Sequence, residues 1–255
     1  MPNAVTLKMQ RAMSQLPQVD TMPIPSLVDH NSAEDAAYGA VNGANLLFSL
    51  QRAQKARELA VSYRDFNVGA SILSYTLNPL TARLLSGLNV TPQKNGELNM
   101  HAEQLALQKV SDWGANLISL IAVVGEVQAD TQSGFIADTL HPCGLCREAL
   151  DESETIDDDR TIIASALPDL RTIELYSFGA LKRFHETGNF REIYQAKLPE
   201  LELLTPFIPP SNGQAITLED TPELRREERI WESTIGIPLL NYRLTSQWPQ
   251  STSSQ

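Results

Sequence analysis

The stretch LISLIAVVGEV at residues 117–127 decides the fold class of this chain. It is a continuous apolar run rich in β-branched residues, which is typical of a strand buried on both faces. Before it, HAEQLALQKVSDW at 101–113 has spaced apolar residues and is followed by Gly114, which predicts a helix that ends there. After it, PCGLCREALDE at 142–152 predicts a second helix that opens at its proline. A buried strand between two helices indicates an α/β layered domain.

The flanking sequence extends this pattern on both sides. Four further strands are predicted, at 66–77, 84–90, 161–167 and 172–178. The first two are separated by a turn that contains Asn78 and Pro79, so we expect a β-hairpin there. A helix is predicted from the N-cap residue Ser32 to about Ala60, where the chain is rich in Ala, Leu, Gln and Arg and lacks proline.

The domain organisation follows from where this pattern stops. Residues 1–31 carry four prolines and no sustained period, which predicts an irregular N-terminal arm. Residues 32–190 hold the predicted α/β domain. Residues 191–255 contain a proline-rich linker and are predicted to be a C-terminal extension.

Composition excludes several classes of protein. The chain has 255 residues with 20 Lys and Arg against 31 Asp and Glu, so its net charge is −11. A nucleic-acid partner is not expected, because such binding rests on basic side chains that contact phosphates and no basic run is present. The sequence shows no secretory signal and no apolar segment long enough to cross a membrane, so a cytoplasmic protein is expected.

Three segments carry the residues suited to chemistry: FNVGA at 66, HAEQ at 101 and PCGLCR at 142. The two cysteines, Cys143 and Cys146, are three positions apart at a predicted helix start, so their sulfurs share one face. The spacing alone leaves open a metal site, a redox pair or chance. Together with His101, they form a set that suits Zn²⁺ with a fourth position left for water.

Two neighbouring residues bear on what such a metal could do. Glu103, two positions after His101, lies on another side of the helix and could exchange protons with a bound water rather than bind the metal. Taken alone it is an ordinary acid in a first helical turn. His141, beside Pro142, is the candidate for a fourth ligand of a closed, structural site.

His-x-Glu followed by Pro-Cys-x-x-Cys resembles the signature of zinc-dependent nucleobase deaminases. The forms HAEQ and PCGLCR, with FNVGA upstream, resemble the cytidine deaminase family over roughly residues 45–180. The resemblance implies a three-layer α/β/α fold with a central mixed five-stranded sheet. It also implies hydrolytic deamination of cytidine or deoxycytidine in pyrimidine salvage, and a dimer or tetramer.

The resemblance also implies a role for each matching residue. His101, Cys143 and Cys146 are expected to hold Zn²⁺, and Glu103 to transfer protons. The remaining roles are in binding: the Ala102 backbone is expected to hold the base carbonyl, Phe66 to pack on the pyrimidine ring, and Asn89 to bind the ribose. Taken alone, Phe66 is more simply explained as a core aromatic residue of a strand.

The sequence departs from the family pattern at two places. Thr91 occupies a position where cytidine enzymes usually carry a glutamate that binds the sugar. Blasticidin-type deaminases resemble this chain in that they also lack that acid. Glu97 is a candidate substitute. The stretch ADTQSGFIADTLH at 129–141 makes the interval between His101 and Cys143 longer than expected, at 42 positions. These departures keep open a modified aminopyrimidine nucleoside as the substrate, and a scaffold without enzymatic activity remains a further alternative.

Overall fold

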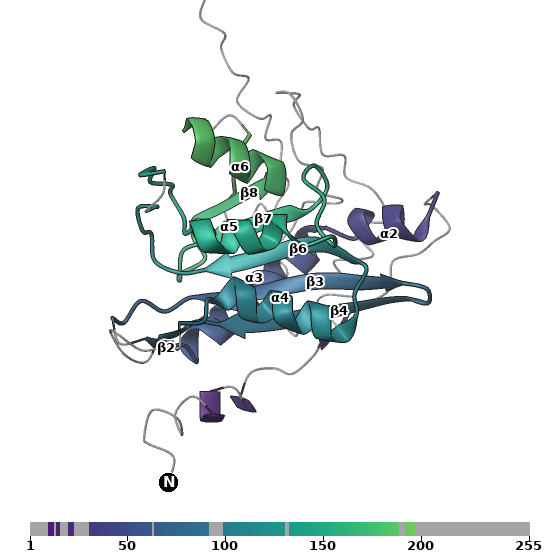
Figure 1. Ribbon diagram of the computed structural model, residues 1–255, viewed down its shortest axis with the longest axis horizontal. Coiled ribbons are helices and arrows are strands. Elements are labelled where there is room, and N and C mark those ends of the chain that lie inside the picture. Colours follow the sequence, from purple (N-terminus) through teal and green to yellow (C-terminus); the bar gives the residue numbers. More distant parts are fainter. Residues whose placement is uncertain are drawn as a thin grey trace, which may run out of the picture.

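The computed structural model describes residues 10–12, 14–15, 20–22, 31–62, 64–91, 99–130, 133–188 and 192–196. A mixed β-sheet runs through the middle of this part of the chain, and helices cover both of its faces (Figure 1). Within the described residues, no helix is long and apolar enough to cross a membrane. Glu97 lies outside the described residues, as do 197–255 of the predicted C-terminal extension.

Five strands form the centre of the main sheet. Their order across it is β4 (Leu80–Leu88), β3 (Gly69–Leu77), β6 (Leu117–Val124), β7 (Ile162–Ala166) and β8 (Ile173–Ser177). Strands β6 and β7 are parallel, and the other neighbours are antiparallel. The predicted mixed five-stranded sheet is therefore confirmed.

Short strands extend this sheet and form a second one. β1 (Asp20–Thr21) pairs with β4, and β9 (Tyr194–Ala196) pairs with β8. A separate two-stranded sheet joins β2 (Val61–Ser62) to β5 (Val90–Thr91). β1 and β9 belong to the segments predicted as arm and extension, so both segments contribute to the sheet. The predicted domain limits themselves stay a prediction.

The helices form the two outer layers. α2 (Ala33–Gly39) and α3 (Gly43–Glu58) pack on one face, and α4 (Ala102–Trp113), α5 (Gly144–Asp151) and α6 (Phe178–Thr187) on the other. Adjacent residues of one strand serve both cores: Leu120 packs in the cluster with α3, and Ile121 in the cluster with α4. Burial on both faces explains why LISLIAVVGEV is apolar without alternation. The predicted three-layer α/β/α fold is confirmed.

The single helix predicted from Ser32 to Ala60 is wrong, because the structure has two helices there. Ser32 does cap the first, since its side chain accepts a hydrogen bond from the Asp35 amide. The break follows Gly39, and Asn42 then caps α3 by accepting a hydrogen bond of 2.9 Å from the Asn45 amide. The Asn45 side chain in turn donates to the Ala40 carbonyl. These local polar bonds compete with a continuous helix.

The predicted hairpin is present, but its second strand begins at Leu80 rather than at residue 84, directly after the turn at Asn78 and Pro79. Helix α6 was not predicted. It follows β8 without a loop, its first turn is capped by Ser177, and it ends at Gly188 with a φ of 71°. Both residues are ordinary helix-boundary signals.

Candidate active site

The three predicted metal ligands lie at the starts of two helices. His101 is the N-cap residue of α4, and Cys143 is the N-cap residue of α5, with Cys146 in the first turn. Nδ1 of His101 is 3.3 Å from Sγ of Cys143 and 3.4 Å from Sγ of Cys146, and the two sulfurs are 3.5 Å apart. Residues 42 positions apart in the chain therefore converge on one point.

This donor set fits zinc. In a tetrahedral site with Zn–S bonds of about 2.3 Å and Zn–N bonds of about 2.0–2.1 Å, ligand atoms lie roughly 3.5–3.8 Å apart. The observed separations of 3.3–3.5 Å are close to those edges. Among the described residues, this trio is also the one group of His, Cys, Asp and Glu side chains close enough to hold a metal ion. Three protein ligands leave the fourth corner open.

The electrostatics of the two sulfurs favour a cation between them. The pKa of Cys143 is lowered to about 4, chiefly by its hydrogen bond with Cys146 and further by His101, while burial opposes the shift. The contact with Cys143, together with burial, raises the pKa of Cys146. One sulfur is therefore a thiolate at neutral pH, and a metal ion makes both into thiolates.

The start of α4 is placed by a close approach to β4. A Cβ atom on Gly87 would lie 2.1 Å from the Ala102 carbonyl oxygen and 2.7 Å from the Ala106 nitrogen. Only glycine permits this distance, so Gly87 brings the first turn of α4, with its imidazole ligand, against the sheet.

Glu103 lies beside the metal site in the first turn of α4. Glu103 is a buried residue, with 5% of its surface exposed. Burial raises its pKa, and the negative charge of Cys143 raises it further. A carboxyl group with a raised pKa can accept a proton and return it near neutral pH.

A cavity of about 570 Å³ opens next to these residues. The four predicted substrate-binding residues all line it: Phe66, Asn89, Thr91 and Ala102. Glu103, His101 and Cys143 line it too, so the structure brings the predicted site residues together around one space, with Cys146 held behind Cys143. Their roles stay predictions at this point.

Asn89 has a structural task besides the predicted one. Its side-chain oxygen accepts a hydrogen bond of 2.7 Å from the Val68 amide, and its side-chain nitrogen donates to the Phe66 carbonyl at 2.8 Å. The amide group therefore holds the loop that presents Phe66 to the cavity. Each amide nitrogen carries two protons, so one remains for a ligand.

Thr91 takes part in a short polar chain at the cavity wall. Its hydroxyl donates to the Asn99 side chain at 2.7 Å, and the Asn99 amide nitrogen is 3.5 Å from Nε2 of His101. Asn99 thus links Thr91 to Nε2 of His101, the ring nitrogen that faces away from the metal site. Asn99 was not predicted as a site residue, because a lone asparagine before a helix carries no motif.

His141 is not among the metal ligands. Its Nε2 lies 2.9 Å from the Glu174 carboxylate, and both side chains are buried. The same carboxylate oxygen also accepts the Thr139 backbone amide and hydroxyl. The closed four-ligand arrangement that the sequence left open does not form. Glu174 was missed, although an acid inside the apolar stretch TIELYSF is an unusual residue for a buried strand.

A hydrolytic deaminase is the class of protein that this arrangement defines: an open His-Cys-Cys metal site, a buried acid beside it and an adjoining cavity in an α/β/α fold. The family model "Cytidine and deoxycytidylate deaminase zinc-binding region" matches residues 45–162, a segment that contains all the ligands and Glu103. Residues 45–162 therefore match the zinc-binding region of cytidine and deoxycytidylate deaminases, and zinc is the metal that this region and its donor set indicate.

Several solved structures are similar to the chain. A cytidine deaminase from Burkholderia pseudomallei is 22% identical, covers 61% of this chain and 94% of its own, and has a TM-score of 0.37. One from Mycobacterium leprae is 22% identical over 54% of this chain and 96% of its own, with a TM-score of 0.38. One from Mycobacterium tuberculosis is 24% identical over 46% and 81%, with a TM-score of 0.34. None of the curated protein sequences matches the chain.

Proposed function

We propose that this protein catalyses the zinc-dependent hydrolytic deamination of a cytosine-type nucleoside, cytidine or deoxycytidine, to the uracil-type nucleoside and ammonia. The observation that carries the proposal is the convergence of His101, Cys143 and Cys146 at two helix starts, beside the buried Glu103 and at the wall of a nucleoside-sized cavity.

The chemistry divides between the metal and the chain. Zinc, when bound by His101, Cys143 and Cys146, supplies Lewis acidity that makes water a nucleophile near neutral pH. Glu103 takes a proton as water attacks C4 of the base, and it delivers that proton to N3. It then transfers the second proton to the departing amine. Burial suits Glu103 to this work, because its raised pKa lets it hold a proton between these steps.

The cavity wall orients the base. The Ala102 amide lies in the first turn of α4, where backbone N–H groups lack intrahelical partners, so it can donate to the base carbonyl. Phe66 packs on the pyrimidine ring from the loop that Asn89 holds. The remaining proton of the Asn89 amide is directed to the ribose hydroxyls. Together these contacts place C4 at the metal.

A modified aminopyrimidine nucleoside is the second candidate substrate. Among the described residues that line the cavity, Glu103 is the only acid, and the hydroxyl of Thr91 is already donated to Asn99. A charged hydrogen bond to a sugar hydroxyl is worth about 1.5–3 kcal/mol. The lack of a second acid among these residues favours a sugar other than plain ribose, as blasticidin-type deaminases accept.

The cellular setting is also part of the proposal. Pyrimidine salvage uses this reaction, and two zinc-binding thiols suit the reducing conditions of the cytoplasm. We propose a homo-oligomer, a dimer or a tetramer, as in the family. A small nucleoside is the expected partner rather than a nucleic acid, given the net charge of −11.

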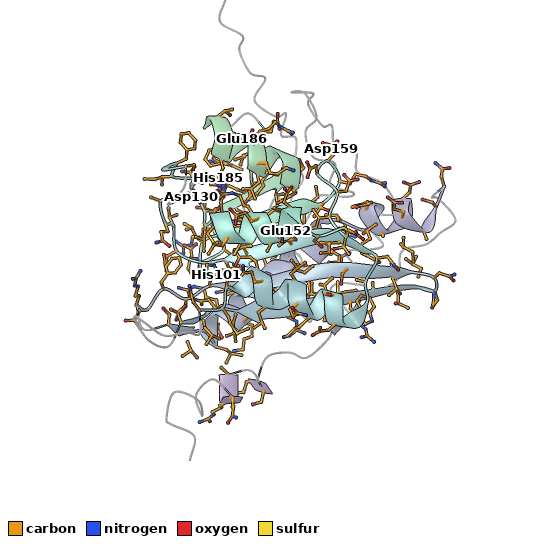
Figure 2. All side chains as sticks on the ribbon, viewed as in Figure 1. His101, Asp130, Glu152, Asp159, His185 and Glu186 are labelled. Atoms are coloured by element: carbon orange, nitrogen blue, oxygen red, sulfur yellow. The ribbon has the colours of Figure 1, made fainter. Side chains whose placement is uncertain are left out.

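A spectrophotometric assay tests the proposal. Cytidine and deoxycytidine are incubated with the zinc-loaded protein, and the loss of cytosine absorbance is followed for wild type and Glu103→Gln. The matched control is Glu152→Gln, the same change on the exposed residue that directly follows α5 (Figure 2). We expect Glu103→Gln to lose at least about a hundredfold in kcat and the control to keep it. Equal rates in Glu103→Gln and wild type would refute the proposal.

A further inference from the structure

A second cavity of about 370 Å³ adjoins the first. It extends along the stretch 129–141 and reaches His185 on α6. Figure 2 shows His101, Asp130 and His185 on the same side of the molecule. Among the described residues that line both cavities, Leu140 is the one with an aliphatic side chain. Leu140 is therefore the apolar part of the boundary between the two cavities.

Leu140 belongs to an apolar cluster at the first cavity. The same cluster contains Val68, and Phe66 packs against it. All three side chains line the first cavity, and Leu140 keeps 8% of its surface exposed. In the proposed function, Phe66 packs on the pyrimidine ring. Leu140 extends this apolar surface from the stretch 129–141, which lies far from Phe66 in the chain.

A glycine makes room for the Leu140 side chain. A Cβ atom on Gly125, the residue that follows β6, would lie 2.3 Å from Cδ2 of Leu140 and 3.5 Å from Cγ2 of Val68. The tip of Leu140 therefore rests directly on the backbone after β6, beside Val68. This contact supports the Leu140 side chain from one side.

The residues before and after Leu140 are bonded to one buried carboxylate. Oε2 of Glu174 accepts hydrogen bonds from the Thr139 amide at 3.1 Å and from the Thr139 hydroxyl at 2.5 Å. The same oxygen lies 2.9 Å from Nε2 of His141. Glu174 has 0% of its surface exposed. The carboxylate on β8 thus holds the chain on both sides of Leu140, whose own side chain contacts Gly125 and the cavities instead.

A second bond from the sheet to this segment lies at the surface. Gln195 is the residue opposite Glu174 on β9, and its side chain donates to the Asp138 carboxylate. Both residues are exposed. A hydrogen bond between exposed groups contributes little, because water replaces it readily, whereas a bond to a buried charged group contributes more. Glu174 is therefore the stronger of the two holds on the segment.

We propose that Leu140 is a specificity-determining residue that contacts the base, and that Glu174 is the positioning residue that holds it in the cavity wall. The inference rests on the proposed function and goes beyond it. Because Glu174 is fully buried, it acts on the substrate through Leu140. Asn89 and Thr91, the sugar-side residues, line only the first cavity, whereas Leu140 lies at its boundary with the second, so the contact is with the base and not with the sugar.

A double-mutant cycle tests the inference. Leu140→Ala should raise KM for cytidine by about tenfold and leave kcat within about twofold, since an apolar contact to the substrate is lost. Glu174→Met keeps the length of the side chain but is at most a weak acceptor, and it should raise KM by about fivefold or more. In the double variant, Glu174→Met should add less than about twofold to the effect of Leu140→Ala, because its effect passes through that side chain.

Two comparisons show that the contact is to the base and independent of turnover. The changes in KM should be equal for cytidine and deoxycytidine, which differ only in the sugar. In the Glu103→Gln background, the dissociation constants of cytidine, measured by calorimetry, should change by the same factors in Leu140→Ala and Glu174→Met.

Further variants assign the effect to hydrogen bonding. Glu174→Gln keeps an acceptor oxygen for Thr139, and its amide nitrogen can take the place of Oε1, which has no hydrogen-bond partner within the described part of the chain. Its KM should stay closer to wild type than to Glu174→Met. Gln195→Met, the matched replacement at the exposed position opposite, should leave KM as in wild type.

Zinc content and circular dichroism verify that each variant is folded. If Glu174→Met does not fold, Thr139→Val takes its place in the cycle, because it removes the hydroxyl donor and keeps the carboxylate. KM should then rise by about twofold or more, and the rise should again disappear in the Leu140→Ala background.

The outcomes separate this inference from the proposed function. Turnover of cytidine with the same KM in wild type, Leu140→Ala and Glu174→Met overturns the inference alone. An effect of Glu174→Met that persists in full beside Leu140→Ala overturns it too, as does an equal effect of Gln195→Met. Failure of the zinc-loaded wild type to turn over cytidine or deoxycytidine overturns the proposed function and the inference with it.

Discussion

At the scale of single residues, Thr91 is the position where substrate choice is most open to test. It lines the cavity wall on the side of Asn89, and its hydroxyl is donated to Asn99. An acid there could accept hydrogen bonds from sugar hydroxyls, whereas the threonine is already engaged.

Thr91→Glu should therefore lower KM for cytidine by about tenfold, the effect of one charged hydrogen bond near the lower end of its range. Steady-state kinetics with cytidine measure it, and 2′,3′-dideoxycytidine, which lacks those hydroxyls, should show no gain. Thr91→Gln is the matched control of similar size without the charge. If KM for cytidine is the same in all three proteins, residue 91 does not face the sugar.

Gly87 supports the site from the neighbouring strand. Gly87→Ala places a methyl group about where the Ala102 carbonyl lies, at 2.1 Å, and the backbone of α4 must move. We expect a loss of about 1–3 kcal/mol in the free energy of unfolding, together with weaker zinc binding because His101 moves too. Denaturant unfolding and a zinc competition assay measure the two effects. Ser86→Ala, one position away, serves as the control; an equally small effect of both changes would contradict the close approach.

At the scale of elements, the pair Asp130–Arg147 joins the stretch 129–141 to α5. Burial alone would raise the pKa of Asp130, but hydrogen bonds from Arg147 and Ser133 outweigh it and hold this pKa well below its usual range. Because the folded-state pKa is depressed, the pair stabilises the protein above the ordinary aspartate pKa of about 3.9 and loses this contribution as the pH falls toward the folded value.

Asp130→Asn should thus cost roughly 1–3 kcal/mol in the free energy of unfolding at pH 7. The difference from wild type should shrink steadily below about pH 4, because Asp130 is protonated there in the unfolded chain but still ionised in the folded protein. Urea unfolding between pH 3 and pH 7 measures this dependence. A difference that is constant across this range would show that the carboxylate charge contributes nothing.

Several elements could be predicted from the sequence because one local signal decides each of them. The run at 117–127 predicts β6 since a strand buried on both faces needs no polar residues, and Gly114 marks the end of α4 with a φ of 74°. The break between α2 and α3 could not be predicted in the same way. It depends on side-chain bonds from Asn42 and Asn45 that compete with an otherwise continuous helical pattern.

The residues of the site also differ in whether they could be predicted from the sequence. The ligands and Glu103 could be predicted, because metal chemistry restricts both residue type and spacing. Glu174 and His185 could not, because each bonds to a partner distant in the chain, and Asn99 could not, because a lone asparagine before a helix carries no motif. Glu174 reaches residues 139 and 141 from β8, and His185 reaches Ser133 from a helix that was not predicted.

At the scale of the whole molecule, charge governs which partners are accepted. With a net charge of −11, the protein repels a polyanion, and binding to nucleic acid depends on basic contacts to phosphate. We expect no retention of single-stranded DNA or RNA in a filter-binding assay at 150 mM salt. Micromolar binding that weakens as salt rises would instead favour a polynucleotide substrate over a free nucleoside.

The central claim is that His101, Cys143 and Cys146 share one zinc ion with an open corner. X-ray absorption spectroscopy at the zinc edge of the purified protein tests this claim most directly. The expected result is one zinc per chain with two sulfur ligands at about 2.3 Å and two nitrogen or oxygen ligands at about 2.0–2.1 Å, of which one is an imidazole. A protein that binds no zinc, or a shell with two imidazoles and no exchangeable ligand, would contradict it.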